Sequence, residues 1–156
     1  MVILENSKRR SLLAALAAAL AALVTNPRRA QGADAESIAQ PETRDDMSFV
    51  AVAFAMQRRA LDSGDQGYGA IVVRNGVIVG QAPSRVVVRQ DPTAHAEMEA
   101  IRDAARRLGS RDLGGCTLYS SSPACPMCEA AAYWSGIERM VYGKAARDGG
   151  SPGLCG

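Results

Sequence analysis

Three side chains in this 156-residue sequence have the types and the spacing of a metal site. His95 is the single histidine, and Cys125 and Cys128 follow it in a Cys-Pro-Met-Cys segment. One imidazole and two thiolates make three ligands, the number that a catalytic zinc ion takes when its fourth position is open for water. Zinc lowers the pKa of that water from 15.7 to roughly 7. Glu97, which follows His95 after one residue, is placed to carry the proton.

Each of these residues also has a simpler interpretation. A single histidine on an apolar helix face is more often a core residue than a ligand, and Glu97 at a helix start is favoured by the helix dipole alone. A Cys-x-x-Cys pair can be a thioredoxin-like redox centre. The combination is more specific than its parts, because a His-x-Glu segment followed by a Cys-x-x-Cys segment is the signature of zinc-dependent deaminases. We therefore expect one zinc ion (Zn²⁺) per chain.

The elements that position these residues begin with a helix and a hairpin. Apolar residues recur at helical spacing from about residue 46 to residue 63, where a Gly-Asp-Gln-Gly segment ends the helix. The β-branched runs 70–74 and 77–81 flank Asn75-Gly76, which is a strong hairpin signal. Residues 82–91 are expected to form a loop.

The second half of the domain alternates helices and strands. Thr93 is a candidate N-cap for a helix with an apolar stripe that ends at Gly109. A strand at 117–120, a helix at 126–135 and a strand at 137–142 follow, with a Gly-rich tail after them. The order α-β-β-α-β-α-β predicts an α/β fold, a three-layer α/β/α sandwich.

The segment Asp91–Glu97 (DPTAHAE) resembles the first motif of the cytidine/deoxycytidylate deaminase superfamily. Cys125–Cys128, with the sequence AYWSGI at 132–137, looks most like its guanine deaminase branch, and tRNA adenosine deaminases are also similar. The resemblance runs from about Met47 to Asp148. It implies a cytidine deaminase-like fold, zinc held by one His and two Cys, and hydrolytic deamination of a nucleobase or nucleoside with Glu97 as proton shuttle. We expect the substrate to be a free purine such as guanine.

The resemblance also implies substrate contacts. The backbone N–H of Ala96 and groups near Ser121–Pro123 would hold the base edge. Ser84 is the nearest counterpart of an Asn that contacts substrate, and Tyr133 or Trp134 would lie near the ring. Plain core packing is the simpler interpretation of at least one of these two aromatic residues. The family usually has Pro directly before the first Cys, where this chain has Ala124. The chain also ends soon after the expected last strand, so we expect a short version of the fold that lacks the C-terminal strand and helices.

The first 35 residues read as an export signal rather than as part of the fold. A basic segment containing Arg9-Arg10 precedes the apolar run Leu12–Val24, which has the length of a signal-peptide core. The paired arginines resemble a twin-arginine signal. We expect 1–35 to direct export to the periplasm, 36–45 to be a linker and 46–156 to be the deaminase domain. A cytoplasmic protein with an Ala-rich terminal helix is the alternative.

Removing the leader changes the charge argument. The whole chain has a formal net charge of +2, but residues 36–156 hold 13 basic and 14 acidic residues. A nucleic-acid-binding domain usually has a basic surface, so we expect a small-molecule partner, and no membrane association of the mature form. A homodimer is possible, and so is a disulfide between Cys116 and Cys155. The alternatives that stay open are a tRNA or cytosine/cytidine deaminase, a non-catalytic zinc-binding domain, and a redox protein.

Overall fold

The computed structural model describes residues 37–154, so the expected export signal and Cys155 lie outside the described residues. Within them the predicted order of elements is confirmed, with one strand added at the end. The elements are α2 (Asp46–Asp62), β1 (Gly69–Arg74), β2 (Val77–Pro83), α3 (Ala96–Leu108), β3 (Cys116–Ser120), α4 (Pro126–Trp134), β4 (Arg139–Tyr142) and β5 (Arg147–Gly150). No helix within this part of the chain is long and apolar enough to cross a membrane.

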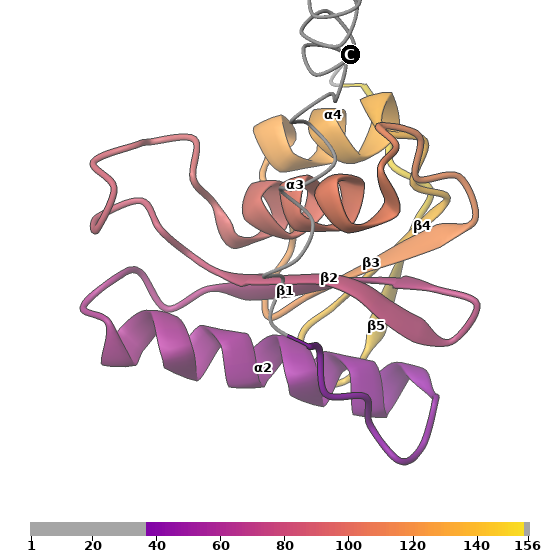
Figure 1. Cartoon of the computed structure of the whole chain (residues 1–156), viewed down its shortest axis with the longest axis horizontal. Helices are drawn as coiled ribbons and strands as arrows, with labels where there is room; N and C mark the ends of the chain where they lie inside the picture. The colour runs from indigo at the N-terminus through magenta and orange to yellow at the C-terminus, as the bar shows by residue number, and fades with distance from the viewer. Residues whose placement is uncertain (1–36, 155–156) are drawn as a thin grey trace, which may run out of the picture. The chain divides into compact units, whose positions relative to one another are not determined.

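The five strands form one mixed sheet in the order β2-β1-β3-β4-β5. β1 is antiparallel to both of its neighbours, β3 and β4 are parallel, and β5 returns antiparallel to β4. Helix α2 covers one face of the sheet, and α3 and α4 cover the other (Figure 1). The α/β/α sandwich is therefore confirmed.

Helix α2 packs closely on the centre of the sheet. Its N-cap, Asp45, accepts a hydrogen bond of 2.7 Å from the backbone N–H of Ser48, which satisfies one free donor of the first turn. The helix approaches β1 so closely at Gly69 that a Cβ atom there would lie 2.2 Å from the Ala53 carbonyl oxygen and 2.2 Å from the Gln57 nitrogen. Only glycine fits at this contact between the helix and the strand.

A polar network fixes the start of α2 on the sheet. Asp46 accepts a hydrogen bond of 2.7 Å from the Tyr119 hydroxyl on β3. It also accepts two hydrogen bonds, of 3.1 and 2.8 Å, from the Arg139 guanidinium on β4. Ahead of the helix, the Gln40 amide exchanges two hydrogen bonds with the backbone of Ile78 on β2. Part of the predicted linker is thus attached to the sheet.

Helix α3 packs on the other face through small residues. Ala96, Ala100 and Ala104 are fully buried, whereas the larger apolar residues of the predicted stripe are half-buried beside them. The close approach is again allowed by a glycine, because a Cβ atom at Gly80 would lie 2.6 Å from the Ala100 carbonyl oxygen. This packing brings the first turn of α3 directly over the sheet.

Two expectations about chain segments are corrected. Thr93 is not the N-cap of α3: its backbone N–H and its hydroxyl both donate to the Asp91 carboxylate, and His95 occupies the cap position. The Gly-rich tail is not without structure, because Arg147–Gly150 forms β5. A carboxylate inside this strand, Asp148, accepts the Gly150 N–H and the Arg139 side chain, which ties β5 to β4.

Four loops meet at one end of the sheet. The start of β1 pairs with the end of β2, through Gly69 and Pro83, and with the end of β3 at Ser120. Ser120 in turn pairs with Tyr142, the last residue of β4. Four loops therefore begin or end at this same end of the sheet: 64–68, 84–95, 121–125 and 143–146.

Candidate metal centre

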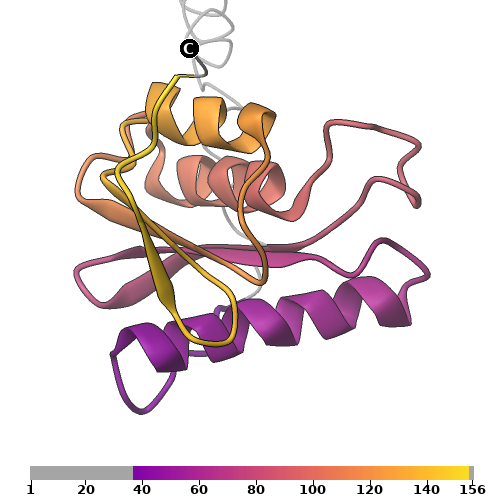
Figure 2. The same ribbon diagram turned by 180° about the vertical axis from the view of Figure 1, so that it is seen from behind.

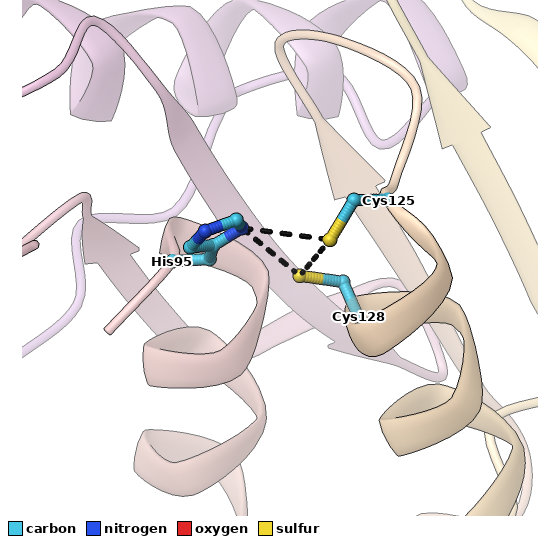
Figure 3. Close-up of side chains that lie close together, drawn as sticks. All are labelled: His95, Cys125 and Cys128. Atoms are coloured by element: carbon cyan, nitrogen blue, oxygen red, sulfur yellow. Dashed lines mark hydrogen bonds between the residues drawn. The ribbon is translucent and has the colours of Figure 1, made fainter. Parts of the chain in front are cut away.

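Three of the predicted site residues form one compact cluster (Figure 3). His95 Nδ1 lies 3.6 Å from the Sγ atom of Cys125 and 3.6 Å from that of Cys128, and the two sulfur atoms lie 3.6 Å apart. Zinc bonds of about 2.0–2.3 Å at tetrahedral angles place N and S ligand atoms about 3.5–3.8 Å from one another. The three donors therefore fit one zinc ion, with a fourth position left over.

The cluster is built from the first turns of two helices. His95 is the N-cap of α3 and Cys125 is the N-cap of α4, and neither side chain makes a capping hydrogen bond. Pro126 follows at the first helical position, where its missing N–H costs nothing, and Cys128 completes the turn. Pro126 thus fixes the backbone at the start of α4 directly after Cys125. The motif expected from the resemblance has its Pro directly before the first Cys. Both cap side chains are left free to act as ligands.

The surroundings of Cys128 disfavour a thiolate when no metal is bound. Burial, followed by the nearby Glu97 carboxylate, raises the pKa of the Cys128 thiol above its ordinary value. A thiol that coordinates zinc is instead deprotonated, and two thiolates balance the charge of the ion. Cys125 and Cys128 are both free of disulfide bonds within the described residues. His95 at equal distance from both sulfur atoms gives the pair a third ligand, which a simple redox pair does not need.

Glu97 lies beside the three ligands without being one of them. Its side chain is 5% exposed, and Oε2 lies 3.7 Å from the Cys128 Sγ atom. Burial raises the pKa of the Glu97 carboxyl above its ordinary value, more than the hydrogen bonds to it lower that pKa. A carboxyl whose pKa moves toward neutrality both accepts and returns a proton readily. The placement suits the proton carrier that the sequence predicts.

Glu97, His95 and Cys125 face a cavity of about 390 Å³, which is in the range of small-molecule sites, and Cys128 is buried behind them. The residues that line it are Gln66, Tyr68, His95, Glu97, Ser122, Pro123 and Cys125. The predicted segment 121–123 supplies Ser122 and Pro123, whereas sequence reasoning missed Gln66 and Tyr68 as site residues. The available signal was positional, because both of these residues precede β1 at the end of the sheet where the loops meet.

Four of the residues predicted as substrate contacts, namely Ala96, Ser84, Tyr133 and Trp134, are not in the set that lines the cavity. Ser84 is fully buried, and its hydroxyl donates a 2.8 Å hydrogen bond to Asp65 Oδ1. Tyr133 and Trp134 lie at the end of α4, 45% and 70% exposed, in edge-to-face contact with each other at 5.3 Å between ring centroids. Ala96 is fully buried next to His95. None of the four is among the described residues that line the cavity.

Asp65 holds two of the loops around the cavity together. Oδ1 accepts hydrogen bonds from the Ser84 hydroxyl and the Gln66 N–H, at 2.8 and 2.7 Å. Oδ2 accepts the N–H groups of Val87 and Val88, both at 2.9 Å. Burial opposes ionisation of this carboxyl, but the four hydrogen bonds together hold its pKa below the ordinary value. The carboxylate thus fixes Gln66, and with it one wall of the cavity.

Sequence comparisons relate the chain to a zinc-binding family and to two deaminases. Residues 43–144 match the family described as the cytidine and deoxycytidylate deaminase zinc-binding region. The chain is 43% identical over 94 residues to the tRNA-specific adenosine deaminase of Aquifex aeolicus, a match that covers 60% of this chain and 62% of that protein. It is 36% identical over 108 residues to the guanine deaminase of Bacillus subtilis, covering 69% of each.

Solved structures show the same likeness. The X-ray structure of guanine deaminase from Bacillus subtilis superposes with a TM-score of 0.62 at 34% identity, over 69% of this chain and 72% of that one. The chain spans less than two thirds of the Aquifex aeolicus protein and slightly more of the Bacillus subtilis one.

Proposed function

The chain belongs to the cytidine and deoxycytidylate deaminase family, and from that premise we propose that it removes an exocyclic amine from a purine base by hydrolysis. The observation that carries the proposal is the position of Glu97. It is a buried carboxyl with a raised pKa that lies in the cavity, against the ligand Cys128, and is left free by the three metal donors. A purely structural zinc site uses four protein ligands and needs no such group.

The residues in and around the cavity would have different roles in the reaction. His95, Cys125 and Cys128 would hold zinc, which when bound supplies water of lowered pKa as a nucleophile near neutral pH. Glu97 would carry the two water protons in turn. It accepts the first as the water oxygen bonds to the ring carbon and passes it to the ring nitrogen, and it then takes the second from the new hydroxyl group and passes it to the amine as the carbon–nitrogen bond breaks. The products are the oxo base and ammonia. Tyr68 and Pro123 offer apolar walls for the flat ring, and the Gln66 amide offers both a donor and an acceptor to its edge.

Guanine is the substrate that we propose first. The supporting observations are the Cys-Pro-Met-Cys and AYWSGI segments and the 36% identity to the Bacillus subtilis guanine deaminase. Adenosine in tRNA is the second candidate, because the identity to the Aquifex aeolicus tRNA-specific adenosine deaminase is 43% over a shorter stretch. The near-neutral charge of residues 36–156 favours the smaller substrate.

An ammonia-release assay on the zinc-loaded full chain tests the proposal. We would offer guanine, adenine, cytosine, their nucleosides and a tRNA anticodon stem-loop. Glu97→Gln should retain zinc and lose about 10²–10⁴-fold in kcat. Glu138→Gln is the matched control, because Glu138 is exposed and accepts the Gly115 N–H at the opposite end of the sheet. Full ammonia release by Glu97→Gln would refute the role of Glu97, and a zinc-loaded chain without activity on any substrate would indicate a non-catalytic domain.

We also propose that residues 1–35 direct export through a twin-arginine pathway. The supporting observations are Arg9-Arg10 and the apolar run Leu12–Val24. A reporter fused behind residue 40 should reach the periplasm, and Arg9→Lys/Arg10→Lys should abolish its export. A reporter that stays in the cytoplasm would refute this proposal.

A further inference from the structure

A second hollow lies beside the cavity of the metal centre. It has a volume of about 400 Å³ and is lined by Ser121, Ser122, Pro123, Tyr142, Gly143, Lys144, Ala145 and Arg147. Ser122 and Pro123 also line the cavity of the metal centre, so the two spaces adjoin along the loop that follows β3. A molecule held in one space would therefore lie directly beside the other.

The charge of the second hollow is positive. Lys144 and Arg147 are both exposed, and neither side chain has a hydrogen bond or ion pair with another residue within 37–154. None of the described lining residues is acidic. The carboxylate next in sequence, Asp148, is already engaged by Arg139 and by the Gly150 N–H. Two cations without a counter-charge make this hollow suitable for an anion.

The turn that presents the two cations is fixed by its backbone. It joins β4 to β5 in a hairpin at the edge of the sheet (Figure 2). The Gly143 N–H donates to the Ser120 carbonyl at 3.1 Å, and the Ala146 N–H donates to the Gly143 carbonyl at 2.9 Å. Ala146 has a φ of 47°, in the left-handed region that side chains rarely adopt. The turn is therefore a defined platform, attached to the strand that leads into the metal centre.

We propose that the second hollow binds a phosphate group of the substrate, so that the base enters the cavity of the metal centre as part of a nucleotide. This inference rests on the proposed function, because the proposed reaction is what places a purine base in the cavity of the metal centre. A ribose would span the shared rim at Ser122 and Pro123, and the phosphate oxygens would accept hydrogen bonds from the Lys144 ammonium, the Arg147 guanidinium and the Ser122 hydroxyl. Tyr142 supplies part of the wall of the second hollow.

The test is a binding measurement that needs no turnover. Zinc-loaded full-length Glu97→Gln would be titrated by calorimetry with guanosine and with guanosine 5′-monophosphate at several salt concentrations. We expect the monophosphate to bind about tenfold more tightly at low salt, and this gap to narrow as salt rises. Adding Lys144→Ala and Arg147→Ala together should close the gap and leave the affinity for guanosine unchanged.

Arg111→Ala is the matched control for these substitutions. Arg111 is also exposed, and it lies in the loop between α3 and β3, at the opposite end of the sheet from the two hollows. Arg111→Ala removes one positive charge, as each of the other two substitutions does. It should leave the difference in affinity between guanosine and its monophosphate unchanged. Zinc content and the melting temperature of every variant would show that the fold is retained.

The outcomes separate this inference from the proposed function. Equal affinity for guanosine and its monophosphate, or no measurable binding of either, would overturn the phosphate site, as would a gap that survives the double substitution. A short single-stranded RNA forms the second arm. A phosphate effect in the mononucleotide identifies a free nucleotide, whereas tighter binding of the RNA without any effect in the mononucleotide would overturn the proposed nucleotide site in favour of polynucleotide binding. Ammonia release is measured separately, so its absence would refute the reaction without removing the measured preference for phosphate.

Discussion

Replacing Asp65 by asparagine should destabilise the protein, although the side chain touches neither the metal ligands nor the apolar core. Each carboxylate oxygen accepts two hydrogen bonds. Asparagine has one acceptor oxygen, which can serve Val87 and Val88 while its NH₂ group faces the other two partners. The Ser84 hydroxyl can turn to accept, but the Gln66 N–H loses its acceptor.

The magnitude follows from these contacts. A hydrogen bond to a charged acceptor contributes about 1.5–3 kcal/mol, so Asp65→Asn should lower the free energy of unfolding by about 2 kcal/mol. Asp65→Ala leaves three backbone N–H groups without acceptors and should cost about 4 kcal/mol. In a domain of this size each kcal/mol corresponds to about 4 °C in melting temperature. Ser84→Ala removes one of the four contacts and is the control, with an expected loss of about 1 kcal/mol.

The loss of stability caused by Asp65→Asn should depend on pH. The pKa of the Asp65 carboxyl is lowered in the folded state, so its contribution is complete above its unfolded pKa of about 3.9 and is lost as the pH falls. Melting curves measured by circular dichroism should show wild type and Asp65→Asn about 8 °C apart at pH 7, and converging below about pH 4. A gap of less than 2 °C at pH 7, or one that stays constant with pH, would refute the reasoning.

Three further predictions follow from contacts in the fold. Gly69→Ala should cost about 3 kcal/mol in urea denaturation, because the new Cβ atom would meet the backbone of α2 at 2.2 Å; an unchanged midpoint would contradict the close approach. Cys128→Ser should leave less than about half an equivalent of zinc by metal analysis, whereas Cys116→Ser, away from the cluster, should retain it. Asp46→Asn should lower stability by only about 1 kcal/mol, because the ion pair with Arg139 is partly exposed, and a loss above 3 kcal/mol would show that the network matters more.

The metal ligands could be predicted from the sequence because their chemistry depends on residue type and short spacing. His95, Glu97 and the Cys-x-x-Cys pair lie at helix starts, and the local pattern that defines those starts is readable without the rest of the fold. The order of helices and strands was predictable for the same reason. Asn75-Gly76 marked the first hairpin, and positive φ angles at both residues confirm it.

The walls of the cavity could not be predicted in this way, because they depend on contacts between distant segments. Nothing local shows that the Ser84 hydroxyl turns to Asp65, or that Gln66 lines the cavity, until β1 and β2 are paired. The strand β5 was missed because two of its four residues are glycine, which weakens any strand pattern. The homodimer and the pairing of Cys116 with Cys155 stay predictions.

The gathering of four loops at one end of the sheet has a consequence for how such a protein can change its substrate. The close helix–strand contacts at Gly69 and Gly80 lie within the strands, whereas Gln66, Ser122 and Lys144 lie in loops beyond the strand ends. Substitutions in these loops alter what the cavity admits at little cost to the packed layers. A library randomised at the three loop positions would sample new specificities around a constant metal site.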